Sequence, residues 1–356
     1  MIYYIYMKQF FIILFLIGLG FFGYLGYQRY DSARDTIRNL NATLQQKTTT
    51  INNQSSLESQ IKTLESEIDQ QKIYTILAGG DIMLDRGVEG KIKKLDKNYD
   101  FAFDLIRNDF NAADFVFANL EGPISDLGAD TGKKYSFRFE PAVAQALKNA
   151  GIDIVSLANN HMFDWGRNAL CQTTQLLDKQ FLFYVGAGCN SQQAEKAYTF
   201  TLGNTTVAIL AYTEFYKGAH ARENSPGISE YDIKKIQQRI DELRLKQSVD
   251  IVMVSMHWGE EYKDRATDHQ VTMAHELINT GANVIIGHHP HVDQEIERYK
   301  DGWIIYSLGN LVFDQSWSEN TMEGLLAEIQ IQNKRVYDIV PKKIQLNENF
   351  QPAIVK

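Results

Sequence analysis

The chain has 356 residues, of which 44% are hydrophobic and 22% are charged, and its formal net charge is -8. This length and composition suit one large or two ordinary globular domains with a substantial apolar core. The negative net charge disfavours electrostatic binding to the phosphates of nucleic acid, so we expect no nucleic-acid partner.

The first thirty residues are predicted to be a membrane anchor. Residues 10–27 carry no charge and are almost wholly apolar. With residues 2–7 before them they are long enough to cross a bilayer of ~30 Å. No small-residue cleavage site follows, which favours an uncleaved signal anchor over residues 1–30, with a core helix as the alternative. More basic residues follow the span than precede it, which slightly disfavours an extracytoplasmic globular domain. The layout of a short N-terminal tail, one span and one large domain favours that location. We therefore expect a single-pass protein of the cell membrane with an extracytoplasmic globular domain.

Residues 31–72 are predicted to form a helical stalk or a solvated linker. This segment is polar and its aliphatic residues keep heptad spacing in two short runs, with a break of register between them. The heptad residues are Ile37, Leu40, Leu44 and Ile51, then Leu57, Ile61, Leu64 and Ile68. A stalk of this kind could hold a weak homodimer, whereas a polar linker would not.

Residues 73–345 are predicted to form one α/β domain. The expected strands are 74–78, 115–118, 152–158, 250–256 and 283–286, and the expected helices are 101–113, 141–150, 167–179, 232–246 and 268–280. Hairpins are expected at 199–212, 295–307 and 324–340. Alternating strands and helices indicate a parallel core, and the hairpins add antiparallel strands, so we expect an α/β fold with a sandwich tendency.

The chain has two cysteines, Cys171 and Cys189. Their spacing does not suggest a metal knuckle. They could pair in an extracytoplasmic protein, but two separate buried thiols are the preferred interpretation.

Polar residues that an apolar core would not choose follow five of the predicted strands. They stand in residues 79–87, 119–122, 159–164, 257–262 and 288–291. The ends of parallel strands lie along one edge of a sheet, where open α/β folds bind ligands. Carboxylate, amide and imidazole groups would converge there, and these groups bind borderline divalent ions. Two such ions ~3.5–4 Å apart can hold both the attacking and the leaving oxygen of a phosphoryl displacement.

Each of these residues also has a plain structural interpretation. Asp81 could cap a helix, Glu121 could be a buried acid satisfied by backbone donors, and Asn160 could be a turn residue. His161 and His257 could be ordinary packed histidines. The ordered recurrence at five strand ends favours one shared site instead.

This ordered set resembles the CapA family, also called the poly-gamma-glutamate synthesis family, whose fold is that of the calcineurin-like metallophosphoesterases. The resemblance covers about residues 76–313. Its blocks are GDIMLDRG (80–87), NLEGPI (119–124), LANNHMFDWG (157–166), HWGEEY (257–262), GHHPH (287–291) and YSLGNLVFD (306–314). It implies a calcineurin-like metallophosphoesterase sandwich, preceded here by the transmembrane helix and the helical stalk.

The resemblance also implies a role for each matching residue. The metal ligands would be Asp81, Glu121 as the bridging carboxylate, Asn160, His257, His289 and His291. His161 would be the general acid that protonates the leaving oxygen, and His288 is an alternative ligand if the register shifts by one. The ions would be Mn, Zn or Fe, in two sites of which one is weaker.

The sequence departs from the wider superfamily at two of these positions. Met83 stands where the first motif has a histidine, so one ion lacks an imidazole and could be held by water or by another side chain. Glu121 stands where other members have aspartate, which lengthens the bridging side chain by one methylene. Both departures are typical of the CapA branch and bear on how efficiently a phosphoester could be turned over.

Arg86 and Arg138 are candidates for binding an anionic substrate, because the guanidinium fork fits phosphate and carboxylate. A surface or ion-paired role is the alternative for each of them.

Two functions follow from these expectations. The first is a membrane-anchored, metal-dependent phosphoesterase that acts on a phosphoester substrate. The second is a non-catalytic accessory subunit that binds a metal or an anionic polymer beside the membrane-embedded synthase or exporter of a capsule polymer such as poly-gamma-glutamate.

Overall fold

The computed structural model describes residues 7, 36–50, 54, 57–58, 60–61, 63, 72–216 and 218–355. The chain divides into two compact units, Met1–Glu67 and Ile68–Lys356. Of the predicted membrane anchor over residues 1–30, the structure describes residue 7 alone, and the apolar run at 10–27 lies outside the described residues. Of the helices in the described ranges, none is long and apolar enough to cross a membrane.

In the first unit, residues 36–50 are helical, within the segment predicted as a stalk. The heptad residues Ile37 and Leu40 are exposed there. The pairing of two chains through this segment stays a prediction.

The second unit contains the sheets and most of the helices. Its strands are β1 Tyr74–Ile82, β2 Phe115–Leu120, β3 Ile154–Ser156, β4 Phe183–Val185, β5 Ala187–Gly188, β6 Tyr198–Leu202, β7 Thr205–Thr213, β8 Gly227–Ile228, β9 Ile251–His257, β10 Val284–His288, β11 Ile296–Tyr299, β12 Gly302–Ile305, β13 Asn310–Val312, β14 Glu323–Gln332, β15 Arg335–Leu346 and β16 Pro352–Ile354. Its α-helices are α3 Arg86–Lys94, α4 Arg107–Ala112, α5 Val143–Asn149, α6 Gly166–Lys179, α7 Ser191–Ala194, α8 Ile233–Asp241 and α9 Asp268–Thr280. Shorter helical turns are η2 Tyr99–Phe103, η3 Glu242–Lys246 and η4 Asn320–Met322.

Two mixed sheets form the framework of this unit. The larger has the order β16-β15-β14-β1-β2-β3-β4, with β13 also paired to β1, and the smaller has the order β11-β12-β10-β9-β7-β6. Strands β1 to β4 run parallel, as do β7, β9, β10 and β12. The remaining neighbours β14, β15, β16, β6 and β11 are antiparallel. The predicted parallel α/β core with added antiparallel strands is therefore confirmed.

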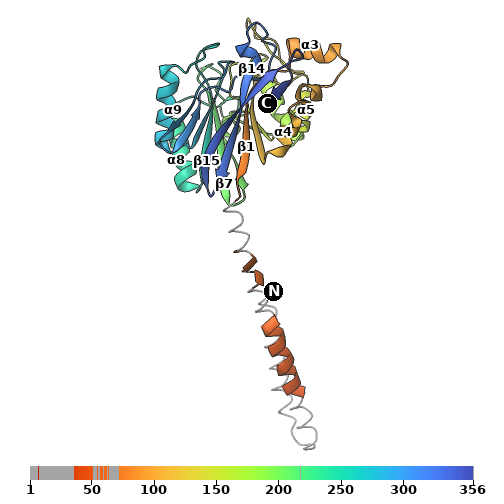
Figure 1. Cartoon of the computed structure of the whole chain (residues 1–356), viewed down its shortest axis with the longest axis vertical. Helices are drawn as coiled ribbons and strands as arrows, with labels where there is room; N and C mark the ends of the chain where they lie inside the picture. The colour runs from red at the N-terminus through yellow and green to blue at the C-terminus, as the bar shows by residue number, and fades with distance from the viewer. Residues whose placement is uncertain are drawn as a thin grey trace, which may run out of the picture. The chain divides into compact units, whose positions relative to one another are not determined.

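The two sheets face each other across a shared apolar core, and helices cover their outer faces. That inner core combines Ile76 and Phe117 of the larger sheet with Met253 and Ile286 of the smaller one. Figure 1 shows α8 and α9 on one side of the strands, and α3, α4 and α5 on the other. Helix, sheet, sheet and helix thus form four layers, and the strand ends lie at the rim of the two sheets.

The strand sequences explain this layering. In β9, Ile251 and Met253 point into the core between the sheets, while Val252 and Val254 point toward the core beneath α8 and α9. Because successive strand residues point to opposite faces, a strand covered on both faces must be apolar throughout. His257, at the end of this apolar run, is therefore a polar residue that packing alone does not explain.

Three sequence expectations differ from the structure. The helix expected over 101–113 is broken into η2 and α4, and the break lets both Phe103 and Ile106 reach the core. The preferred interpretation of Cys171 and Cys189 as separate thiols is wrong, because the two form a disulfide with their Cα atoms 4.9 Å apart. That bond ties α6 to the segment after β5. The larger sheet also continues past residue 345, since β16 pairs with β15.

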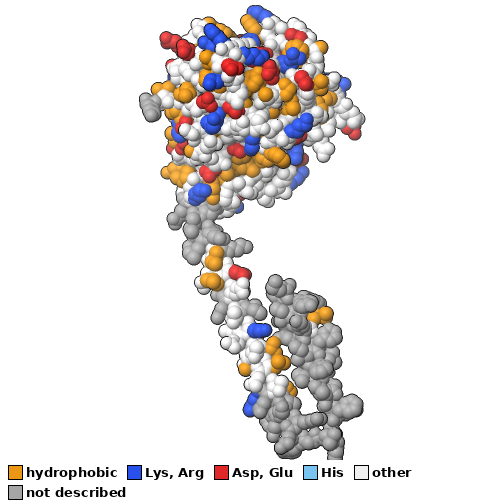
Figure 2. All heavy atoms as spheres, turned by 90° about the vertical axis from the view of Figure 1, so that its right-hand side faces the viewer, with side chains coloured by type: hydrophobic (Ala, Val, Ile, Leu, Met, Phe, Trp, Pro, Cys, Tyr) orange, Lys and Arg blue, Asp and Glu red, His pale blue; other side chains and the backbone are white. Residues whose placement is uncertain are grey.

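The surface carries charges of both signs. On the face of the second unit drawn in Figure 2, acidic and basic side chains are interspersed and separated by apolar ones. This face has no large patch of a single sign.

Candidate metal centre

The carboxyl-terminal ends of strands from both sheets meet at one place. Nδ2 of Asn119 donates to Oδ1 of Asp81 at 2.8 Å, and the backbone N–H of His289 donates to Oδ2 of Asp81 at 3.2 Å. Nε2 of His257 lies 2.8 Å from Oδ1 of Asn160. These contacts join the ends of β1 and β2 to the ends of β9 and β10, and also to the loop after β3.

The innermost part of this place is a group of three possible metal ligands. One ligand atom from each of Asp81, Glu121 and His257 lies within 4.8 Å of the others. All three side chains are fully buried. Two carboxylates and an imidazole at this separation could coordinate one ion.

A second group lies beside the first and nearer to solvent. One ligand atom from each of Glu261, His289 and His291 lies within 4.8 Å of the others, and Glu261 is exposed. His291 links the two groups. Its Nε2 is 3.7 Å from Oε1 of Glu121, and its Nδ1 is 3.4 Å from Oδ2 of Asp81.

Glu121 has no hydrogen-bonding partner for its charge. Its side chain is fully buried, and neither carboxylate oxygen accepts a hydrogen bond from any residue that the structure describes. Burial raises the pKa of Glu121 well above its ordinary value, and the charge of Asp81 raises it further. A buried carboxylate in this condition is costly unless a cation stands beside it.

Two histidines beside Asp81, His257 and His289, are buried in a way that favours their neutral form. Burial would raise the pKa of Asp81, but the close approach of the His288 and His291 rings outweighs burial and holds that pKa well below its ordinary value. Burial lowers the pKa of His257 far below its usual range and lowers that of His289 to about 3. Neutral imidazole is the form that binds metals.

His161 is held in a fixed orientation by a second buried carboxylate. Its Nδ1 lies 2.7 Å from Oδ2 of Asp164, and its ring stacks on Phe137 at 4.1 Å between centroids. Asp164 also accepts the backbone N–H of Phe137 at 2.8 Å and lies 2.8 Å from Nζ of Lys133. With Nδ1 occupied in this way, Nε2 of His161 faces Glu121, 3.7 Å from its Oε1.

The loop after β10 is bent sharply to present its histidines. His289 and His291 both have positive φ angles, 98° and 59°, which side chains other than glycine rarely adopt. Gly287 precedes them, and a Cβ there would lie 1.8 Å from the carbonyl oxygen of Tyr306. Such strained backbone persists only where surrounding contacts fix it, and it is frequent at functional sites.

The two arginines proposed for substrate binding are engaged elsewhere. The guanidinium of Arg86 forms an ion pair with Asp314 and lies over the ring of Phe137. The guanidinium of Arg138 lies 3.6 Å from the ring centroid of Trp165. Neither arginine belongs to the two groups of ligand atoms, so their role in binding substrate stays a prediction.

Four residues of this site were not singled out from the sequence. Asn119 lies between Asp81 and His257 and contacts both. Asp164 orients His161, and Oδ1 of Asn310 lies 3.1 Å from Nδ1 of His291. Glu261 belongs to the outer group. All four stand inside the blocks that carried the family resemblance. Their positions in those blocks were the available signal, but their roles depend on contacts between distant segments.

The donor set fits divalent cations. It offers carboxylate oxygens, an amide oxygen and neutral imidazoles, which together suit ions such as Mn²⁺, Zn²⁺ or Fe²⁺. The strongest evidence for a bound cation is that both carboxylate oxygens of Glu121 lack a hydrogen-bond partner among the described residues, and a cation would be such a partner.

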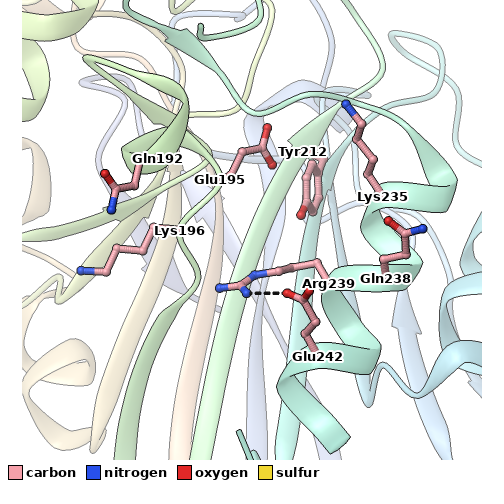
Figure 3. Close-up of a pocket in the computed structure, with 8 residues that line it drawn as sticks. All are labelled: Gln192, Glu195, Lys196, Tyr212, Lys235, Gln238, Arg239 and Glu242. Atoms are coloured by element: carbon pink, nitrogen blue, oxygen red, sulfur yellow. Dashed lines mark hydrogen bonds and ion pairs between the residues drawn. The ribbon is translucent and has the colours of Figure 1, made fainter. Parts of the chain in front are cut away.

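A separate pocket of 510 Å³ lies between α7 and α8 (Figure 3). Its lining mixes acidic, basic and amide side chains, among them Glu195, Arg239 and Glu242, and it includes Tyr212 of β7. Arg239 is paired with Glu242. This pocket shares no residue with the two groups of ligand atoms.

The sequence matches one protein family and is similar to several named proteins. Residues 75–315 match the model of the family described as "Bacterial capsule synthesis protein PGA_cap". The chain is 33% identical over 282 residues to the capsule biosynthesis protein CapA of Bacillus anthracis, covering 76% of this chain and 67% of that protein. It is 34% identical over 283 residues to the PGA biosynthesis protein CapA of Bacillus subtilis, covering 78% and 72%. A protein of Mycobacterium tuberculosis named "Probable polyglutamine synthesis accessory protein" is 27% identical over 286 residues, covering 68% and 75%. Among solved structures, a hypothetical protein from Thermus thermophilus superposes with a TM-score of 0.49 at 16% identity, covering 76% of this chain and 99% of that one.

Proposed function

The chain belongs to the bacterial capsule synthesis protein family PGA_cap, and on that premise we propose that it works in making an anionic capsule polymer of the poly-gamma-glutamate type. Its contribution is a divalent-metal site that cleaves a phosphoester. In this proposal the two facing sheets are a calcineurin-like metallophosphoesterase sandwich.

The observation that carries the proposal is the state of Glu121. A fully buried carboxylate with two unpaired oxygens lies beside a second buried carboxylate, Asp81. Without a cation, one carboxyl of such a pair must keep a proton at the expense of stability, whereas a bound cation offsets the negative charge of both. The imidazoles of His257 and His289, whose pKa values are lowered by burial, add nitrogen ligands without adding positive charge of their own.

In this proposal the ligands are Asp81, Glu121, Asn160, His257, His289 and His291. Bound divalent ions would supply Lewis acidity toward a phosphoryl group and hold the reacting oxygens in line. Asn119 holds the Asp81 carboxylate in place through its 2.8 Å hydrogen bond. The amide oxygen of Asn160 is turned toward the same place as the imidazole of His257.

His161 is the proposed general acid. Asp164 accepts from Nδ1, so Nε2 is the atom that carries the transferable proton and faces the ligand cluster. Burial lowers the pKa of His161, and the hydrogen bond to Asp164 opposes that decrease. The pKa stays below its ordinary value, so in this proposal the proton that His161 delivers to a leaving oxygen is one that Nε2 gains in the complex with substrate.

We further propose that the globular unit works outside the cytoplasm, anchored to the cell membrane by residues 1–30. The Cys171–Cys189 disulfide supports this location, because such bonds persist in oxidising compartments. The uncharged apolar run at residues 10–27 supports the anchor.

The test is the hydrolysis of an aryl phosphate by the purified full-length chain in detergent, with Mn²⁺ or Zn²⁺ added. His161→Ala should lower the rate by about 10²–10⁴-fold, and Asp81→Ala should remove the dependence on added metal. His275→Ala is the matched control, since that imidazole pairs with Glu297 away from the ligand groups. Equal rates in the parent and in both site variants would refute the enzyme.

A second function is favoured by one comparison, the relative named as an accessory protein of polyglutamine synthesis. In this alternative the metal site binds the anionic polymer or a membrane synthase subunit without cleaving a bond. Co-purification separates the two functions. A complex with synthase subunits that persists in His161→Ala but not in Asp81→Ala supports the accessory role, whereas loss of polymer synthesis in both variants supports catalysis.

A further inference from the structure

We propose that Glu261 is a ligand of a second divalent ion, which it binds together with His289 and His291 on the solvent side of the buried group. This inference rests on the proposed function and extends its set of ligands by one residue.

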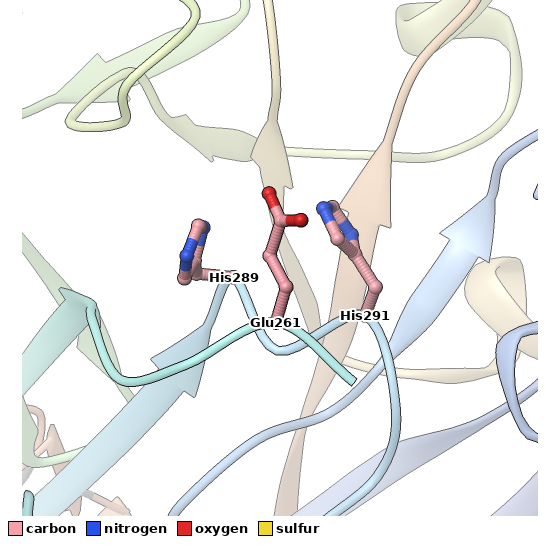
Figure 4. A group of neighbouring side chains, drawn as sticks. All are labelled: Glu261, His289 and His291. Carbon is pink, nitrogen blue, oxygen red and sulfur yellow. The ribbon is translucent and has the colours of Figure 1, made fainter. Parts of the chain in front are cut away.

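The geometry of the outer group supports this assignment. The ligand atoms of Glu261, His289 and His291 all lie within 4.8 Å of one another. Figure 4 shows the carboxylate of Glu261 between the two imidazoles, with all three side chains extending to the same side of their loops. One carboxylate and two imidazoles are a common partial ligand set for Mn²⁺, Zn²⁺ or Fe²⁺.

The loop that carries Glu261 is fastened on both sides of that residue. The backbone N–H of Tyr262 donates to the carbonyl of Pro290 at 2.8 Å, and the N–H of Trp258 donates to the carbonyl of His288 at 3.1 Å. The N–H of Gly259 donates to the carboxylate of Glu214 at 2.7 Å. Glu261 is exposed, but these bonds fix its backbone against the loop of the histidines.

Unpartnered buried atoms provide a second and independent observation. His289 is 6% exposed, and its Nδ1 has no hydrogen-bond partner among the described residues. Both oxygens of Glu121 are in the same condition, and Nε2 of His291 lies 3.7 Å from one of them. The two groups together therefore offer more unpartnered atoms that could bind a metal than the three ligand atoms of the inner group.

The balance of charge also calls for two cations. The carboxylates of Asp81 and Glu121 belong to the inner group, and that of Glu261 belongs to the outer group beside it. Three carboxylates around one place bring three negative charges, and one divalent ion leaves one of them unbalanced. A second ion, at the position where Glu261 can reach it, removes that repulsion. Because Glu261 faces solvent, this ion keeps open positions for water or substrate.

The experiment measures Mn²⁺ binding to the full-length chain in detergent by equilibrium dialysis. The parent should bind two ions per chain. Glu261→Gln, which keeps the size of the side chain but removes its charge, should weaken one of the two by at least about tenfold and leave the other. Glu261→Asp should fall between them. Glu260→Gln is the matched control, because that neighbour is exposed and belongs to neither group.

The possible outcomes separate this inference from the proposed function. Two ions bound by Glu261→Gln with the affinity of the parent would overturn the role of Glu261 and leave the buried site standing. A single ion bound equally by the parent and by Glu261→Gln would do the same. No ion bound by the parent would overturn the proposed metal site as well.

Discussion

Replacing Glu121 by glutamine should stabilise the protein when metal is absent and remove most of the stabilisation that metal provides. The side chain is fully buried and its two oxygens have no hydrogen-bond partner in the part of the chain that the structure describes. Glutamine has nearly the same shape and carries no charge. The substitution therefore removes the cost of keeping a buried carboxyl protonated and also removes the negative charge that would bind a cation.

The size of the effect follows from the ionisation of this carboxyl. Its folded pKa is raised above the ordinary 4.5, so the folded state holds a proton that the unfolded state releases. The resulting loss of stability is absent below the ordinary pKa and grows by about 1.4 kcal/mol per pH unit until the folded pKa is reached. Near pH 7 it is at most about 3 kcal/mol, so glutamine should raise the free energy of unfolding by about 1–3 kcal/mol.

Bound metal should make the parent more stable than the Glu121→Gln variant, which reverses the order of stability expected without metal. Free Mn²⁺ at about 100 times its dissociation constant should stabilise the parent by about 3 kcal/mol, and the variant by much less. Urea unfolding followed by tryptophan fluorescence, with chelator and then with Mn²⁺, measures both effects. All four tryptophans of the chain belong to the second unit.

Asp164→Asn is the matched control for this experiment. Asp164 is as deeply buried as Glu121, but its carboxylate has partners in His161, Lys133 and the backbone of Phe137. The control should lose stability in both conditions, because it breaks existing contacts. If Glu121→Gln is destabilised in chelator as much as Asp164→Asn, the reasoning about an unpaired buried charge is wrong.

Three further predictions concern the same unit. Asp164→Asn should lower kcat on an aryl phosphate by about 10²-fold or more with a smaller change in KM, because His161 loses its orientation; an unchanged kcat would refute the positioning role. Replacing both Cys171 and Cys189 by serine should lower the free energy of unfolding by about 3 kcal/mol in urea titrations, since the bond closes a loop of 18 residues, and equal midpoints would contradict it. Gly287→Ala should cost about 2 kcal/mol or more and weaken Mn²⁺ binding, because its Cβ would collide with a backbone carbonyl; normal stability and binding would show that the strand can shift.

The sequence predicted the sheets well because their strands are buried on both faces. The run from Ile251 to Met256 is apolar at every position except Ser255, and it lies between two cores. This apolar run stops abruptly at His257, and the change predicts a polar side chain at the end of the strand. The same contrast marked Asp81 and Glu121, which the structure places within 4.8 Å of each other and of His257.

What the sequence could not supply were contacts between segments far apart in the chain. The approach of Cys171 and Cys189 depends on how α6 packs beside β5, which no local pattern encodes. The place of Glu261 depends on a hydrogen bond from Tyr262 to Pro290. The pairing of Arg86 with Asp314 joins residues more than two hundred positions apart, so a guanidinium that looked free for a substrate is used within the fold.

Anomalous diffraction from crystals grown with Mn²⁺ tests most directly whether this place binds divalent metal. The account predicts a strong peak at about 2.2 Å from an oxygen of Glu121, with a weaker one beside Glu261. Crystals that contain Mn²⁺ at a saturating concentration but show no peak next to Glu121 would contradict it.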